Sequence, residues 1–167
     1  MGFAERVQAQ GSLRLYSDPE FTQCTLSDTG PRLANVYVVE STFISLAVQF
    51  RVAASPGFTG VWLADSSPYY SFGSSQTDLG LYFNQCLSGA FPILTMTYQL
   101  LGTSTCSELT IAPSPGLLFP VCFDCFDEYP CLNNKALHIN CDGSFECGGP
   151  VAVEPSTWGS VKALYRN

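Results

Sequence analysis

The chain has 167 residues, of which 46% are hydrophobic and 13% are charged, and its formal net charge is −7 at pH 7. This length fits one domain, and the high apolar content excludes an intrinsically disordered chain. The negative charge and the seven scattered basic residues also exclude nucleic acid and anionic membranes as expected partners, because both require clustered Lys and Arg.

The first ten residues are expected to form an N-terminal extension. Val7-Gln8-Ala9 has the small residues typical of a signal-peptidase site, although Met1 to Arg6 supplies no apolar segment. We therefore expect Met1–Ala9 to be either the remnant of a secretion signal or a plain polar N-terminus. The folded domain is expected over residues 11–154 and a tail segment over 155–167. No apolar run is long enough to span a membrane.

Alternation of apolar and polar residues predicts β-strands, because a period of two buries one face of a strand. The strongest pattern lies in residues 79–86 and 93–102. We expect these runs to be two adjacent antiparallel strands, since Ser88, Gly89 and Pro92 between them favour a turn. Further strands are predicted over residues 11–16, 33–39, 46–53, 60–64, 106–112, 117–123 and 136–141.

The segments between these strands are rich in turn formers. Residues 17–32 and 65–78 are predicted to be long loops, and Asp142-Gly143 predicts a hairpin between 136–141 and 144–147. The tail has helical spacing at Trp158, Val161 and Leu164 and strand spacing at Val161, Ala163 and Tyr165, so both interpretations stay open. Many short strands with almost no helical pattern predict an all-β fold, a single antiparallel β-sandwich.

The chain has eight cysteines, which predicts that their thiols are oxidised to disulfides. An even and high count is typical of extracellular proteins, so we expect disulfides and a location outside the cell or at the cell surface. Pairing between sequence neighbours would give Cys24–Cys86, Cys106–Cys122, Cys125–Cys131 and Cys141–Cys147, although spacing alone does not fix the connectivity. The Cys122-x2-Cys125 step resembles half of a zinc site, but a second closely spaced pair is missing, so disulfides are favoured.

Metal binding and catalysis have weaker signals. Oxygen-bearing residues alternate over 140–146 around Asp142, and Asp124, Asp127 and Glu128 form a second acidic group, which suggests calcium. However, the repeated Asp of a calcium loop is missing, and Asp-Gly by itself makes a turn. The single histidine, His138, lies between apolar residues, and no catalytic motif is present. We therefore predict no metal, no cofactor, no catalytic residue and no enzymatic activity.

Aromatic residues near a polar segment are the better candidates for binding. Trp62, Tyr69, Tyr70 and Phe72 lie in or beside the polar segment 65–78, and aromatic faces bind sugars or protein surfaces well. These residues predict a glycan- or protein-binding site. The alternative is that the rings cover one end of the sandwich core.

The two ends of the chain suggest self-assembly. A terminal strand can complete the sheet of a neighbouring molecule, with main-chain hydrogen bonds and side-chain pockets holding it. The candidate residues are Leu13 and Leu15 near the N-terminus and Trp158, Val161, Leu164 and Tyr165 in the tail. The alternative is that both ends close their own sandwich.

Several motifs carry a resemblance to known proteins. The order LAVQFRVA, GVWLA, LGLYFNQC and ILTMTYQLLG is similar to cohesin-type and related immunoglobulin-like modules, while GSLRLYSD, CLSG, INCDGS and TWGSVKALYR resemble uncharacterised secreted proteins of environmental bacteria. This resemblance implies a non-catalytic extracellular β-sandwich. The leading hypothesis is a structural or adhesive module, a self-assembling subunit of a filament or surface layer. The alternative is a carbohydrate- or protein-binding module.

Overall fold

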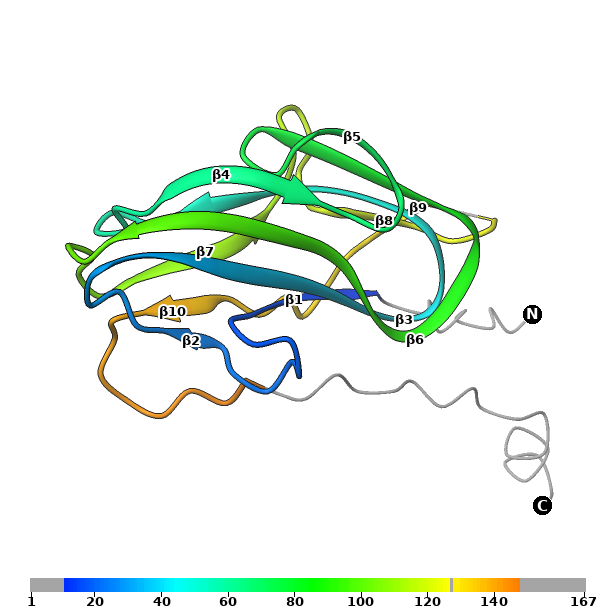
Figure 1. Ribbon diagram of the computed structural model, residues 1–167. Helices are drawn as coiled ribbons and strands as arrows, with labels where there is room; N and C mark the ends of the chain where they lie inside the picture. The colour runs from blue at the N-terminus through cyan, green and yellow to red at the C-terminus, as the bar shows by residue number, and fades with distance from the viewer. Residues whose placement is uncertain (1–10, 127, 148–167) are drawn as a thin grey trace, which may run out of the picture.

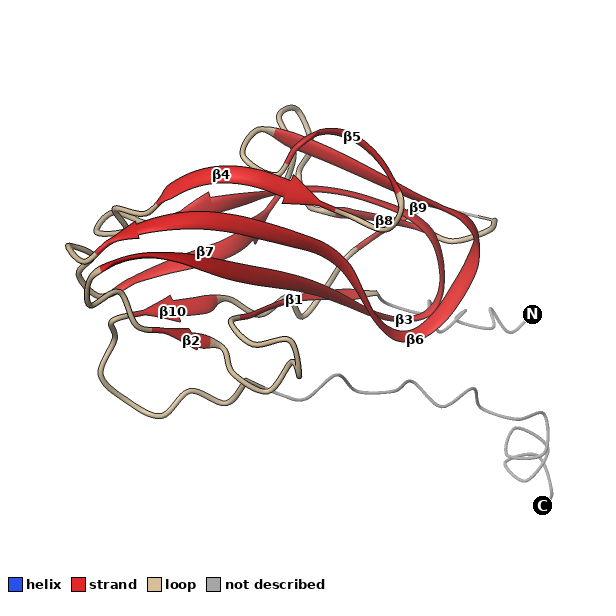
Figure 2. Cartoon of the chain, viewed as in Figure 1, coloured by secondary structure: helices blue, strands red, loops and turns tan. Residues whose placement is uncertain are grey.

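The computed structural model describes residues 11–126 and 128–147, and this part of the chain forms strands and loops only (Figures 1 and 2). The all-β prediction is confirmed. The described part of the chain includes no helix of the length and apolarity that a bilayer crossing requires. The strands are β1 (Ser12–Tyr16), β2 (Thr25–Leu26), β3 (Pro31–Ala54), β4 (Val61–Ser66), β5 (Tyr70–Ser74), β6 (Asp78–Leu101), β7 (Ser107–Ala112), β8 (Val121–Phe123), β9 (Glu128–Pro130) and β10 (Leu137–Ile139).

Two long strands organise the molecule. β3 and β6 have 24 residues each and run antiparallel, from the pair Pro31↔Leu101 to the pair Phe50↔Leu79. β1 and β8 pair with β3, while β4 and β5 pair with opposite halves of β6. The end of β3 pairs with β7, which continues through β10 to β2. β3 and β6 curve along their length, and the layers enclose one core to give a β-sandwich (Figure 1).

The structure corrects the prediction of two strands over residues 79–86 and 93–102. Both runs belong to β6, and both pair with β3 rather than with each other. The buried side chains change phase between them, from Leu81 in the first half to Met96 in the second. Gly89, with φ 93°, and the shifts in register against β3 accommodate this change. The turn formers therefore bend one strand instead of reversing the chain, and residues 33–39 and 46–53 are likewise two parts of β3.

The core consists of inward-facing side chains from both long strands and from the strands beside them. Burial of each such side chain stabilises the fold by about 1.5–3 kcal/mol. Leu13 and Leu15 of β1 are fully buried, and β1 pairs with β3 of its own chain. The largest fully buried side chains are Tyr16, Phe50, Leu13, Leu15, Leu79, Leu81, Ile93, Leu94, Met96, Leu100, Leu109 and Leu137.

All eight cysteines form disulfides, but none of the neighbour pairings is correct. The pairs are Cys24–Cys147, Cys86–Cys125, Cys106–Cys141 and Cys122–Cys131, with Cα–Cα distances of 5.2, 6.1, 4.4 and 5.3 Å. Strand pairing decides the connectivity, since it brings distant parts of the chain together. β10 pairs with both β2 and β7, so the segment after β10 reaches Cys24 and Cys106.

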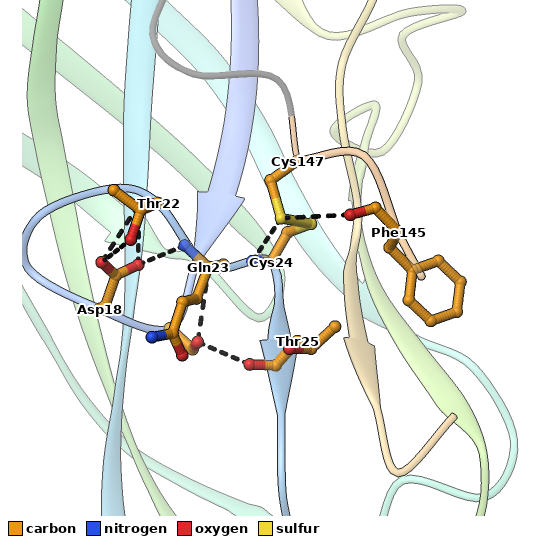
Figure 3. Close-up of a disulfide and its surroundings, with 8 residues drawn as sticks. Asp18, Thr22, Gln23, Cys24, Thr25, Phe145 and Cys147 are labelled. Atoms are coloured by element: carbon orange, nitrogen blue, oxygen red, sulfur yellow. Dashed lines mark hydrogen bonds between the residues drawn. A yellow bond between two sulfur atoms is a disulfide. The ribbon is translucent and has the colours of Figure 1, made fainter. Parts of the chain in front are cut away.

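Hydrogen bonds to Asp18 fix the conformation of the segment before β2, which carries Cys24 (Figure 3). The Asp18 carboxylate accepts hydrogen bonds from the Thr22 hydroxyl at 2.7 Å and from the backbone N–H of Gln23 at 2.6 Å. Burial opposes ionisation of Asp18, but these hydrogen bonds outweigh it and lower its pKa. Cys24 then bonds to Cys147, the last residue that the structure describes.

The hairpin predicted at Asp142-Gly143 is wrong. Residues 144–147 form no strand, and only Leu137–Ile139 of the preceding segment is β-structure. Asn140 leaves the strand with φ 49°, and its side chain donates to the backbone oxygens of Asp28 and Ser104 at 2.9 and 2.8 Å. Cross-links at Cys141 and Cys147 hold the chain on either side of the turn in place of strand pairing.

Candidate binding surface

Two of the four aromatic candidates pack inward. Trp62 is half-buried against the core, and its indole N–H donates to Asp65 Oδ1 at 3.0 Å. The ring of Tyr69 lies edge-on to that of Phe83, with the ring centroids 4.8 Å apart. For these two residues the structure agrees with the alternative expectation, that aromatic rings cover the end of the core.

The other two candidates face solvent. Segment 65–78 is not a loop throughout, because residues 70–74 form β5. Tyr70 and Phe72 alternate on this strand, so they share one face, and their exposed fractions are 72% and 66%. The register with β6 places Tyr70 opposite Tyr82, which is also exposed, and Phe72 opposite Gly80.

The same face continues from β6 across β3 and β8. Tyr82 pairs with Ala47, and Ala47 pairs with Phe123. A surface hollow of about 520 Å³ lies over this row. Its lining residues are Leu46, Ala47, Tyr82, Phe123, Asp124, Cys125, Phe126 and Glu128. Phe126 is 87% exposed. We call the surface formed by Tyr70, Phe72, Tyr82, Phe126 and this hollow the aromatic face.

Covalent and backbone constraints fix the aromatic face on two sides. The Cys86–Cys125 disulfide ties the segment after β8 to β6, directly beside the hollow. At the other end, the tight connection between β5 and β6 requires Gly73, whose φ is 79° and whose added Cβ would collide with the backbone oxygen of Asp78. The rings are therefore mounted on strands and a cross-linked segment rather than on a free loop.

Charge at the hollow is negative. Asp124 and Glu128 line it together with the aromatic rings, and Glu128 is exposed. At the start of β6, the Gln49 side-chain amide donates to Asp78 Oδ1 at 3.0 Å, and side-chain hydrogen bonding lowers the pKa of Asp78 and keeps its carboxylate ionised. The aromatic face thus combines apolar contact area with acidic groups, which can pair with basic groups on a bound molecule.

Sequence reasoning missed Tyr82, Phe123 and Phe126. Tyr82 had a usable signal, because it is an aromatic residue at an outward position between buried Leu81 and Phe83. Phe126 had no comparable signal, since it lies in an irregular segment between two cysteines. Its place beside Tyr82 follows from the pairing of β8 with β3 and from the disulfide.

Two titratable groups away from the aromatic face, His138 and Glu40, are packed within the fold. The imidazole of His138 stacks on Phe145 with 3.8 Å between ring centroids, and its Nδ1 lies 3.0 Å from Glu108 Oε1. Glu40 is completely buried, and burial raises its pKa to about 8. Of the residues suspected of binding calcium, Asn140 is instead hydrogen-bonded through its side chain to the backbone oxygens of Asp28 and Ser104, and Asp127 lies outside the described residues. No cluster of three or more His, Cys, Asp or Glu suited to a metal occurs within residues 11–126 and 128–147.

Of the six candidate assembly residues, two lie within the part of the chain that the structure describes. Leu13 and Leu15 belong to the core of their own molecule. Trp158, Val161, Leu164 and Tyr165 lie outside the described residues, as does the tail segment 155–167 as a whole.

Comparison with known proteins identifies the class of fold. No family model and no curated protein matches the sequence. Among solved structures, the third ScaB cohesin of R. flavefaciens in complex with a group 1 dockerin is similar with a TM-score of 0.55 and 7% identity, covering 83% of this chain and 99% of that one. A type II cohesin domain from the cellulosome of Acetivibrio cellulolyticus is similar with a TM-score of 0.53 and 11% identity, and the match covers 78% of this chain and 95% of that one.

A third structure extends the same likeness. The sixth cohesin of Acetivibrio cellulolyticus scaffoldin B, in complex with a Cel5 dockerin mutant, gives a TM-score of 0.52 at 10% identity and covers 80% of this chain and 99% of that one. The chain therefore has a cohesin-like β-sandwich fold, which confirms the fold expected from the sequence. The likeness is one of fold.

Proposed function

We propose that this chain is an extracellular, non-catalytic module that binds a partner protein through its aromatic face. The observation that carries the proposal is the row of exposed rings on paired strands, with Tyr70, Phe72 and Tyr82 on one side of the sheet. Aromatic side chains are the residues most enriched at the energetic centre of protein interfaces. A monomeric protein that left such a row uncovered would carry an aggregation hazard.

The rigid backbone that carries the rings supports a role in binding a partner protein. Tyr70 and Phe72 sit on a strand, and Phe126 follows a disulfide-bonded cysteine, so little backbone entropy is lost when a partner docks. The hollow beside Tyr82 gives a bound side chain a place to insert. Asp124 and Glu128 at this hollow indicate a partner whose apolar contact residues are flanked by Lys or Arg.

A protein partner is favoured over a glycan by two observations. Two of the similar cohesin structures are complexes with dockerins, so the same fold presents a binding surface for protein in those molecules. In addition, the aromatic face is dominated by rings and aliphatic groups, whereas sugar recognition also requires converging polar groups. Extracellular location is supported by the four disulfides, because such bonds persist in oxidising compartments.

The experiment compares matched variants of the full chain. Immobilised wild-type protein, the double variant Tyr70→Asp with Phe72→Asp, and the control Leu118→Asp with Leu132→Asp are exposed to secreted and surface proteins of the source organism. All four substituted side chains are exposed, so each variant should fold. Each captured protein is then purified, and its affinity for the three forms is measured by calorimetry.

The expected result is a purified partner that binds wild type and control equally and binds the Tyr70/Phe72 variant about a hundredfold more weakly. Partners that bind all three forms with equal affinity would overturn the aromatic face as the site. If no protein discriminates the forms and a glycan array shows binding that depends on Tyr70 and Phe72, the ligand is a carbohydrate and the proposal is wrong.

A further inference from the structure

The outer edge of β4 is the feature that the proposed function leaves unused. β4 ends the strand order β2-β10-β7-β3-β6-β4, and no strand of the described residues pairs with its outer side. Its sequence, VWLADS, contains no Lys, Arg or Pro, which are the residues that usually protect an exposed edge. An unpaired row of backbone N–H and C=O groups of this kind accepts an added strand.

The side chains along this edge favour an apolar strand. Val61 and Leu63 are about half exposed, and Leu33 is exposed in the same outward row as Val61, because both residues pair with Gln99. The one charged residue of β4 is Asp65, whose carboxylate is occupied. It accepts hydrogen bonds from the Trp62 indole at 3.0 Å and from the Ser75 backbone and hydroxyl at 2.7 Å each.

The tail segment of the chain has the matching composition. Val161, Ala163 and Tyr165 alternate as in a strand, and the only charged residues in 155–167 are Lys162 and Arg166, in a chain of net charge −7. A basic segment of this kind is attracted to the acidic body of a second copy.

The geometry of attachment points to a second copy. The tail follows Cys147, which is bonded to Cys24 beside β2, whereas β4 lies at the other end of the strand order and on the opposite side of the molecule (Figure 1). The point where the tail is attached and the edge of β4 therefore lie on different surfaces of one molecule. A contact between two different surfaces is heterologous, and repetition of it gives an open chain unless the rotation happens to close a ring.

We propose that residues 158–166 of one copy add as a strand to the open edge of β4 in the next copy, which produces head-to-tail assembly. Main-chain hydrogen bonds supply affinity, and Val61 and Leu63 of the acceptor contact the apolar side chains of the donor. This contact uses β4 and leaves Tyr70, Phe72, Tyr82 and Phe126 uncovered, so assembly and partner binding occur on separate surfaces.

The test measures the mass of full-length protein over a concentration series by sedimentation velocity. The acceptor variant is Leu63→Lys, and the donor variant combines Val161→Asp with Tyr165→Asp. The control is Leu118→Lys, the same substitution at an exposed leucine on the β7–β8 connection. Wild type and control should form concentration-dependent oligomers, while each variant alone should associate at least about tenfold more weakly.

Mixing the two variants decides the mechanism. The acceptor variant keeps an intact tail and the donor variant keeps an intact β4 edge, so the equimolar mixture should give a dimer and nothing larger. Three results would overturn the proposal: a wild type that stays monomeric at its solubility limit, oligomers that survive Leu63→Lys, or a mixture that stays monomeric. The last result would indicate pairing of like edges or another contact. All three readouts are independent of any partner of the aromatic face.

Discussion

Asp28 and Asn140, 112 residues apart in the sequence, exchange a pair of hydrogen bonds: the Asp28 backbone N–H donates to Asn140 Oδ1 at 2.8 Å, and Asn140 Nδ2 donates to the Asp28 backbone oxygen at 2.9 Å. The Asp28 carboxylate also accepts from the backbone N–H groups of Gly102 and Ser104 at 2.7 and 3.1 Å. One polar cluster therefore joins the segment after β2, the end of β6 and the end of β10.

Replacement of Asn140 by alanine should show how much this polar cluster contributes to the free energy of unfolding. Loss of its side chain leaves the N–H of Asp28 and two carbonyl groups without their partners, and we expect the free energy of unfolding to fall by about 2–3 kcal/mol. Asn133→Ala is the matched control, because Asn133 is exposed and also has positive φ, 56° against 49°. Urea unfolding measures both. Equal losses would show that backbone conformation, rather than the cluster, accounts for the effect.

Because the Glu40 carboxyl group is buried, we expect the free energy of unfolding to depend on pH in an unusual way. Its carboxylate oxygens are buried without a hydrogen-bond partner among the described residues, and burial raises the pKa to about 8 from an ordinary value of 4.5. Between these values the folded protein holds a proton that the unfolded chain releases. Stability from this group is complete below pH 4.5 and is lost as pH rises to about 8, by on the order of 5 kcal/mol.

Glu40→Gln should remove this dependence. Unfolding curves recorded from about pH 5 to about pH 9 should show a declining free energy for wild type and a flatter profile for the variant. The exposed Glu128→Gln serves as control and should follow wild type. A variant that declines as steeply as wild type would assign the dependence to another group. Tyr69 is a candidate to monitor, because burial and the charge of Glu40 raise its pKa.

The Cys86–Cys125 disulfide should hold the aromatic face in place. Replacing both cysteines by serine should cost about 3–4 kcal/mol of unfolding free energy and should speed hydrogen exchange in residues 124–126. The pair Cys106 and Cys141 closes a loop of nearly equal length, with a separation of 35 against 39, away from the hollow. Its removal should cost as much stability while residues 124–126 exchange at the wild-type rate. Equal exchange in both variants would contradict a local role.

Gly73 should tolerate no side chain. Gly73→Ala places a Cβ against the backbone oxygen of Asp78 at positive φ, so we expect a loss of at least about 1–2 kcal/mol and a loosened β5. Gly80→Ala on the partner strand is the control, since no atom lies within 4 Å of its added Cβ. Thermal unfolding compares the two. If Gly80→Ala destabilises as much as Gly73→Ala, general strand packing and not the turn is responsible.

Local patterns predicted the burial of individual residues better than the path of the chain. The alternating runs predicted over residues 11–16, 79–86 and 93–102 do bury every second residue over much of their length, including Leu13, Leu79 and Leu100, because burial in a strand has a period of two. Alternation failed at Gly89, since a glycine at positive φ serves equally well in a reversing turn and in a bent strand. It also missed β5, whose sequence YSFGS has the serine and glycine content of a loop.

The candidate site was predictable only in part for a related reason. Tyr70 and Phe72 were among the four aromatic candidates, but nothing in the sequence separated them from the inward-facing Trp62 and Tyr69. Tyr82 and Phe126 join them through strand register and a disulfide. Both relationships connect residues that are distant in sequence, so no local spacing encodes them. The disulfide pairs were mispredicted for the same cause, because pairing between sequence neighbours ignores which strands lie side by side.

The Cys24–Cys147 bond determines how the molecule would respond to tension. A force applied between the segment before β1 and the segment after Cys147 passes through β1 to Cys24 and then crosses directly to Cys147. Strands β2 to β10 lie inside the covalent loop, so they bear no load once β1 has been pulled away from β3. A molecule pulled at its two ends would lengthen by a short, fixed amount and keep its aromatic face and its β4 edge intact.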